Sequence, residues 1–209
     1  MLFLDPRISG DGARSCVDCH PNTGSNGKFY DNGVEVEPGS PGARRTPELR
    51  GLWMTAPYLW DGSEKSVRGA LERMLAVEMR GATLDEKDIL ALEQFLLSIR
   101  PFDNGKIEAD GTPIAPVRLA PRRGSEIFVA AKCVRCHKPP SFSHHFLFDV
   151  GTGGKWSVPN LRNVSNQSRW GHDGRWATLE EAVEAILADQ KIKLSDRERT
   201  QLVEYLKLI

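Results

Sequence analysis

The 209-residue sequence has no excess charge of either sign, no long apolar run and little cysteine. Its 28 basic residues balance its 28 acidic ones, so it lacks the basic stripe that a nucleic-acid-binding protein needs. The absence of any run of about 18 apolar residues argues against a membrane span. Because its 4 cysteines all fall in two short segments, no disulfide framework is available. The segment 1–5 is too short to be a signal peptide, so any export signal is expected outside this sequence.

The four cysteines form two C-x-x-C-H segments. These segments are Cys16-Val17-Asp18-Cys19-His20 and Cys133-Val134-Arg135-Cys136-His137. In this spacing the two thiols add to the vinyl groups of one haem while the histidine reaches its iron. A redox C-x-x-C needs no adjacent histidine, and a zinc site would need both pairs around one metal. We therefore predict two covalently bound haem c groups with His20 and His137 as iron ligands. Thioether attachment usually occurs outside the cytosol, so we expect a periplasmic or otherwise extracytoplasmic protein.

The remaining sequence predicts an all-α fold with long loops. Helices are expected over about 66–79 and 85–99, and again over about 124–132. Three pairs match the capping box that begins a helix: Thr83 with Glu86, Thr178 with Glu181, and Ser195 with Glu198. Four prolines indicate an extended linker over 101–121. The predicted domains are therefore 1–100 and 122–209, each with one haem.

The second half of the chain repeats the first. Residues 158–162 match 46–50 at an offset of 112 positions, and Asp173-Gly174 matches Asp61-Gly62 at the same offset. The apolar positions of the last helix match those of 92–99 at an offset of 110. This self-similarity predicts two homologous helical domains related by an internal repeat.

Several motifs resemble the bacterial di-haem cytochrome c peroxidase and MauG family over nearly the whole chain. They are DPRISGDG before CVDCH, TPELR, TAPYLWDG, and RGSEIF…CVRCHKPPSF…VPNLRNV…HDGRWATLEEAV. The resemblance implies two cytochrome c-like domains, of which one haem stores or relays an electron and the other reacts with hydrogen peroxide. It also implies a small redox protein, such as a cytochrome or cupredoxin, as electron donor.

The sequence departs from the family pattern at positions that matter for activity. The loop 21–45 contains no histidine, whereas peroxidases of the family often ligate the first haem from this loop. Tyr58 and Arg68 stand where the family's first domain has Gln and Glu over the reactive iron. The axial Met or Tyr of the family's second domain falls on Ile186, which cannot bind iron. The T-A-P run, which binds calcium in some relatives, lies at 55–57 in the first half instead of the second, and this weighs against calcium here.

Methionine is the candidate sixth ligand of the first haem. Met74 matches the family's axial position, but Val67, Leu71 and Met74 also form an ordinary apolar helix face. Met79 is the alternative. At about 100° per residue the two side chains would point about 140° apart, so a regular helix could turn only one toward the iron. We predict Met74.

Four further residues are candidates for the two haem sites. His172 is expected either to bind iron, to line the distal pocket of the second haem, or to do neither. Glu180 is the candidate proton donor to peroxide, with simple stabilisation of a helix start as the alternative. Arg50 and Arg162 suit haem propionates, since a guanidinium matches a carboxylate, although surface roles are equally compatible.

Two functions remain open from the sequence. One is an enzyme that reduces hydrogen peroxide, or oxidises a partner, with electrons drawn through one haem. The other is a non-catalytic di-haem electron carrier or an electron-transfer subunit of a larger complex, which needs no open haem. The empty ligand position at Ile186 favours the enzyme, whereas the missing Gln, Glu and loop histidine favour the carrier. The oligomeric state is not predicted.

Overall fold

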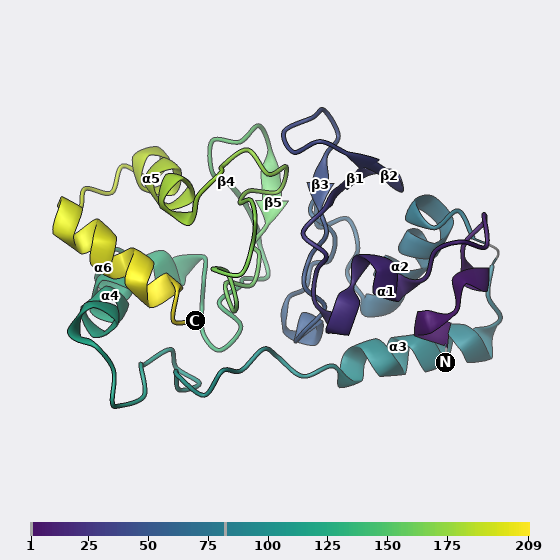
Figure 1. The fold of residues 1–209 in the computed structure, drawn as a ribbon, viewed down its shortest axis with the longest axis horizontal. Helices are drawn as coiled ribbons and strands as arrows, with labels where there is room; N and C mark the ends of the chain where they lie inside the picture. Colours follow the sequence, from purple (N-terminus) through teal and green to yellow (C-terminus); the bar gives the residue numbers. More distant parts are fainter. Residues whose placement is uncertain (1, 82) are drawn as a thin grey trace. The chain divides into compact units, whose positions relative to one another are not determined.

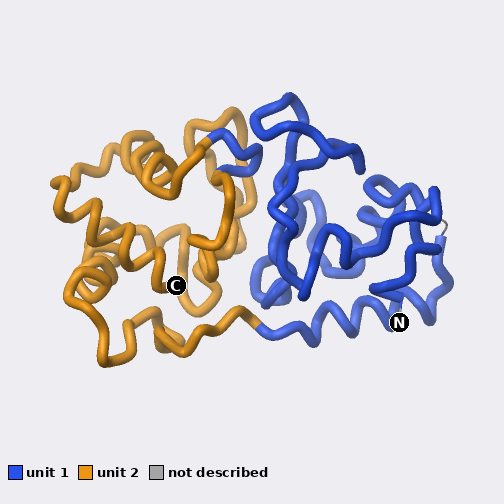
Figure 2. Tube along the Cα trace, viewed as in Figure 1, with its two compact units in different colours: residues 1–100, 171–175 blue, residues 101–170, 176–209 orange. Residues whose placement is uncertain are grey.

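The computed structural model describes residues 2–81 and 83–209 and divides the chain into two compact units. Unit 1 contains residues 1–100 and 171–175, and unit 2 contains residues 101–170 and 176–209 (Figure 2). The short segment 171–175 thus joins the first half of the chain, a grouping that the sequence did not predict. Each unit has its own apolar core.

Unit 1 consists of short helices around the first C-x-x-C-H segment, a small sheet and one long helix (Figure 1). In chain order its elements are η1 (Leu2–Leu4), η2 (Pro6–Ile8), α1 (Cys16–Cys19), η3 (Pro21–Thr23), β1 (Phe29–Asp31), β2 (Val34–Val36), β3 (Arg44–Arg45), η4 (Leu52–Met54), α2 (Val67–Arg73), η5 (Met74–Glu78) and α3 (Glu86–Ser98). Its core joins α2 and α3 to the N-terminal turns through buried Leu71, Ile89 and Leu92.

The small sheet of unit 1 has the strand order β2-β1-β3 and is antiparallel. The pair Asp31 and Val34 flanks a two-residue turn in which Asn32 and Gly33 both have positive φ. Asn-Gly is the preferred sequence for such a turn because both residues tolerate this conformation. The all-α prediction is therefore wrong in this loop. The strands contain only two or three residues, too few for an alternating pattern to be visible in the sequence.

The helices of unit 1 agree with the predicted ranges but differ at one cap. Ser66 caps α2, accepting a hydrogen bond from the backbone N–H of Gly69, as the predicted start at 66 requires. The predicted capping box of Thr83 and Glu86 is wrong. Asp85 caps α3 instead, through the backbone N–H of Asp88. Both are short oxygen-bearing side chains followed by acidic residues, so the sequence pattern fits either position.

Unit 2 repeats the plan of a C-x-x-C-H segment among helices, with one strand pair. Its elements are α4 (Leu119–Ala130), η6 (Cys133–Arg135), β4 (Leu147–Asp149), β5 (Lys155–Ser157), α5 (Leu179–Asp189) and α6 (Asp196–Leu206). The strands β4 and β5 pair antiparallel. The predicted caps are present: Thr178 accepts from the N–H of Glu181, and Ser195 with Glu198 forms the full capping box.

The segment 101–121 is part of unit 2 and not a free linker. Ile107 is buried in the core of unit 2, and α4 already begins at Leu119. Pro121 occupies the first turn of α4, where a missing N–H costs nothing because the first N–H groups of a helix have no intrahelical acceptor. A proline there is therefore a poor indicator of extended chain.

The helices α4 and α6 cross with their backbones in close approach (Figure 1). A Cβ added at Gly124 would lie 2.0 Å from the carbonyl oxygen of Gln201 and 2.6 Å from the Cβ of Tyr205. Near the crossing, the rings of Phe128 and Tyr205 pack edge to face with centroids 5.4 Å apart. The glycine thus sets the distance between the two helices of the unit 2 core.

We expect Gly124→Val to destabilise the protein by about 1–3 kcal/mol, because the added atoms overpack the crossing. The midpoint of urea unfolding should fall, and the exposed Val129→Ala change on the same helix serves as control. An unchanged midpoint for Gly124→Val would contradict the close approach.

The fold is helix-rich with two small sheets. Within the described residues, no helix is both long and apolar enough to cross a membrane.

Candidate haem centres

The first C-x-x-C-H segment ends on a histidine that is held by the backbone. Ser15 begins α1 through a capping box with Asp18, and the backbone N–H of His20 donates to the carbonyl of Cys16 at 2.8 Å. The ring Nδ1 of His20 lies 3.0 Å from the carbonyl oxygen of Gly24. A nitrogen that faces a carbonyl carries the proton, so Nε2 keeps its lone pair free for a metal. Burial lowers the pKa of His20, which favours the same neutral form.

The second histidine is held in the same way. The backbone N–H of His137 donates to the carbonyl of Cys133 at 2.8 Å, and its Nδ1 lies 3.0 Å from the carbonyl oxygen of Phe142. Burial again lowers its pKa. The carbonyl groups of Pro47 and Pro159, which are equivalent at the offset of 112, lie beside His20 and His137 respectively. Both histidines therefore fit the role of an iron ligand through Nε2.

The four thiols also fit covalent haem attachment. All four are free and partly exposed, so none is consumed in a disulfide. Burial raises the pKa of Cys16 and of Cys133 to about 11, which keeps these groups as neutral thiols. Among the described residues there is no cluster of three or more His, Cys, Asp or Glu side chains around a metal position.

The candidate ligand Met74 begins a π-helical turn. The element η5 follows α2 directly, and the backbone N–H of Met79 donates to the carbonyl of Met74 at 2.9 Å. A π turn joins residues five apart, so Met79 follows Met74 on the same side of the helix instead of about 140° away, as a regular helix would require. The side chain of Met79 packs against the core of unit 1, whereas Met74 is half-buried outside that packing. Of the two methionines, Met74 is thus the one whose side chain does not pack in the unit 1 core.

The equivalent position in unit 2 has a side chain that cannot bind iron. Ile186 lies on α5, at the offset of 112 from Met74, and is half-buried. The helix α5 continues without a π turn to Asp189. The two units therefore differ in both side chain and backbone at the same place.

His172 belongs to unit 1 and not to the unit that contains the second C-x-x-C-H segment. It is 7 % exposed, and its ring centroid lies 6.2 Å from that of Trp60. Its carbonyl accepts the backbone N–H of Arg45. Burial lowers its pKa, partly opposed by Asp173. Its role at the second haem stays a prediction.

Glu180 lies at the surface of α5. Its carboxylate is 2.9 Å from the Nζ of Lys207 and its side chain is 53 % exposed. The hydrogen bond from Lys207 lowers the pKa of Glu180. These contacts are those of an acid in the first turn of a helix, and they do not support the expected proton transfer by Glu180.

The arginines predicted to bind propionates are engaged within the protein. Arg50 forms two hydrogen bonds with the carboxylate of Glu48, at 2.7 and 2.9 Å. Arg162 donates to the carbonyl groups of Pro140 and Phe102, and its guanidinium lies 5.5 Å from the ring centre of Phe142. Arg50 thus pairs within its own segment, whereas Arg162 connects three segments of unit 2, and these contacts are sufficient to account for both side chains.

A different arginine, Arg45, was not predicted from the sequence. It is 6 % exposed and lies on β3, close in sequence to the Pro47 carbonyl beside His20. In the sequence it is one of two consecutive arginines in a loop, and no pattern separates it from Arg44.

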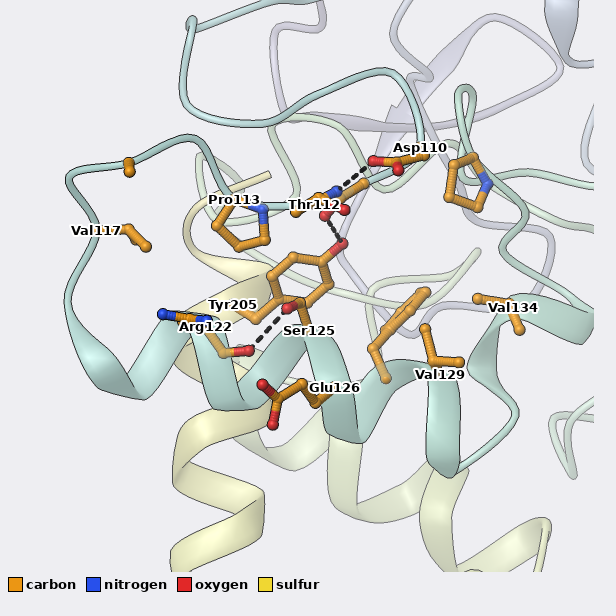
Figure 3. Close-up of a pocket in the computed structure, with 14 residues that line it drawn as sticks. Asp110, Thr112, Pro113, Val117, Arg122, Ser125, Glu126, Val129, Val134 and Tyr205 are labelled. Atoms are coloured by element: carbon orange, nitrogen blue, oxygen red, sulfur yellow. Dashed lines mark hydrogen bonds between the residues drawn. The ribbon is translucent and has the colours of Figure 1, made fainter.

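Unit 2 has a cavity of about 550 Å³ between α4 and the chain that precedes it. Figure 3 shows Tyr205 donating its hydroxyl to a backbone carbonyl at the cavity, that of Gly111 at 2.7 Å. The lining includes Val134 and Pro139, but neither His137 nor a cysteine. We therefore do not assign this cavity to a haem.

Known proteins are similar to this chain in both sequence and structure. The family described as di-haem cytochrome c peroxidase matches residues 1–95. The methylamine utilization protein MauG of Methylorubrum extorquens is 26 % identical, and the alignment covers 100 % of this chain and 76 % of that protein. The cytochrome c551 peroxidase of Nitrosomonas europaea is 23 % identical over 89 % of this chain and 70 % of its own length.

Solved structures share the fold. A chain of the hydrazine synthase of Kuenenia stuttgartiensis superposes with a TM-score of 0.79 at 19 % identity, covering 100 % of this chain and 85 % of that one. The di-haem peroxidase BthA of Burkholderia thailandensis superposes with a TM-score of 0.72 at 17 % identity, covering 98 % of this chain and 83 % of that one.

Proposed function

We propose that this chain is a peroxidase-like oxidoreductase of the di-haem cytochrome c peroxidase and MauG family, with two covalently bound haem c groups, since the family matches residues 1–95 and its relatives align over most of the chain. It takes electrons from a small redox protein, a cytochrome or cupredoxin, through the haem of unit 1. It reduces hydrogen peroxide, or oxidises a partner, at the haem of unit 2. Haem attachment implies a periplasmic or other extracytoplasmic location. Calcium is not part of the proposal.

The observation that carries this assignment is the difference between Met74 and Ile186. Both lie seven residues after the first residue of a helix, α2 or α5, whose N-cap is Ser66 or Thr178. A methionine thioether binds haem iron and raises its reduction potential, whereas an isoleucine side chain has no donor atom. The unit with Met74 therefore suits electron storage, and the unit with Ile186 suits a reaction with an added ligand.

Each residue has a defined part in this proposal. The cysteines hold the haem groups, and the carbonyls of Gly24 and Phe142 fix the protonation and direction of His20 and His137. Met74 would supply a thioether ligand to a haem held in unit 1. A haem that keeps an open position supplies a site at which peroxide can bind. The proton transfer is assigned to no side chain, since Glu180 is held at the surface by Lys207.

The experiment compares the purified holoprotein with and without cyanide and peroxide, by optical absorption and EPR, in the oxidised and one-electron-reduced states. We expect one low-spin His/Met haem that does not bind cyanide and one high-spin haem that does. We also expect the protein to consume peroxide. Two low-spin haems that remain inert to both ligands after one-electron reduction would reject the enzyme. The electron carrier would then be the function.

A further inference from the structure

The side chain of Arg45 is buried, and both of its backbone groups are hydrogen-bonded. The carbonyl of Arg45 accepts the indole N–H of Trp60 at 2.7 Å, and its backbone N–H donates to the carbonyl of His172 at 2.9 Å. Its guanidinium lies 5.8 Å from the centre of the Trp60 ring. With the backbone fixed at both groups and the side chain stacked on a ring, the cation has a defined place within unit 1.

The buried charge of Arg45 is poorly compensated. No acceptor in the described part of the chain lies within hydrogen-bonding distance of its Nε. Burial lowers its pKa to about 10, and the nearby carboxylate of Glu48 opposes this effect in part. Both oxygens of Glu48, however, already accept hydrogen bonds from Arg50. Burying a cation costs free energy unless an anion pairs with it. The site therefore suits a further carboxylate.

The strand that contains Arg45 leads directly to the backbone beside the first histidine. Its strand pairs with Phe29 of β1, and the chain continues from β3 to Pro47, whose carbonyl lies beside the His20 ring. Thr46, between them, is tied to the loop after His20, since its carbonyl accepts the hydroxyl of Ser25 at 2.6 Å. The cation and the iron ligand are thus parts of one hydrogen-bonded segment.

Unit 2 has no cation at the corresponding position. There the pair Leu147 and Ser157 of β4 and β5 takes the place of Phe29 and Arg45, with Pro159 again two residues further on. Ser157 is neutral. The two histidine sites therefore share their backbone arrangement but differ in charge at this strand position, which is Arg45 in unit 1 and Ser157 in unit 2.

We propose that Arg45 binds a propionate carboxylate of the haem attached at Cys16 and Cys19. Haem carries two propionates, and a guanidinium with a free N–H matches a carboxylate in geometry and charge. The inference rests on the proposed haem in unit 1, and it adds a specific electrostatic role. Oxidised iron carries one more positive charge than reduced iron, so the fixed cation favours the reduced state and raises the potential of this haem.

The test uses the holoprotein with Arg45→Leu, Arg45→Lys and the matched control Arg44→Leu on the same strand, where Arg44 donates to its own neighbour's carbonyl. Intact mass measures haem content, redox titration measures the potential of each haem, and resonance Raman records the propionate bending bands. In Arg45→Leu we expect both haems to remain attached, the potential of the unit 1 haem to fall and its propionate band to shift. Arg45→Lys should retain most of the wild-type reduction potential of the unit 1 haem, because lysine keeps the positive charge. It should still shift the propionate bending band, because lysine lacks the planar pair of donors. Arg44→Leu should leave both readouts unchanged.

Two results would overturn the proposal: an unchanged unit 1 potential in Arg45→Leu, or an equal fall in Arg44→Leu. If Arg45→Leu does not fold, Arg45→Lys alone decides, since an unshifted propionate band rejects the contact. A wild-type protein that holds both haems and shows the predicted Arg45 effects, yet consumes no peroxide, would reject the proposed enzyme and leave this contact standing.

Discussion

Replacing Cys133 and Cys136 together by alanine is expected to remove one covalent haem and leave the other. Haem c attachment requires the two thiols of one C-x-x-C-H segment, and the two segments lie in different units with separate cores. Intact mass spectrometry after acid–acetone extraction should show two haem masses above the polypeptide in the wild type and one in the variant. The peroxide reaction should be lost as well, because the proposed open haem belongs to unit 2.

The reciprocal variant provides the control. With Cys16 and Cys19 replaced, one haem should again remain, but the spectrum should keep the high-spin signal and lose the low-spin His/Met signal. A wild-type mass with one haem or none would contradict the assignment of both segments.

Met74→Leu is expected to abolish the sulfur-to-iron band of the unit 1 haem in the near infrared. Leucine has a similar volume but no donor atom, so the sixth position would open while the packing changes little. The reduction potential of this haem should fall, and cyanide should bind to two haems instead of one. Near-infrared absorption and redox titration measure these changes.

Met79→Leu is the matched control, since Met79 follows one π turn later and packs on the unit 1 core. It should keep the band and the potential. Loss of the band in Met79→Leu, with Met74→Leu unaffected, would make Met79 the ligand and contradict our assignment.

Local spacing in the sequence encodes the chemistry of the two haem sites. The two cysteines and the histidine of each C-x-x-C-H segment lie within five consecutive residues, so one helical turn brings them together. The caps at Ser66, Thr178 and Ser195 are likewise predictable, because a cap needs only the residues of its own first turn. The internal offset of 112 positions is also a property of the sequence alone, and it aligns Met74 with Ile186.

Features that depend on contacts between distant segments could not be predicted in this way. The burial of Arg45 follows from Trp60 and from His172, which lies 127 positions further along the chain and packs in unit 1. No local pattern distinguishes Arg45 from Arg44, since both are polar residues in a strand of two. The surface pair of Glu180 with Lys207 also joins separate helices, which is why the sequence suggested catalysis where the structure has an ion pair.

The π turn at Met74 has the same origin. Its residues have no pattern that separates a π turn from a regular helix, and the sequence predicted regular geometry over 66–79. The backbone N–H of Gly10 donates to the carbonyl of Met79 where the helix ends, which anchors this end to the N-terminal segment. The sequence thus supplies the side chains of the haem sites, and packing between distant segments determines which of them are buried, paired or free to bind.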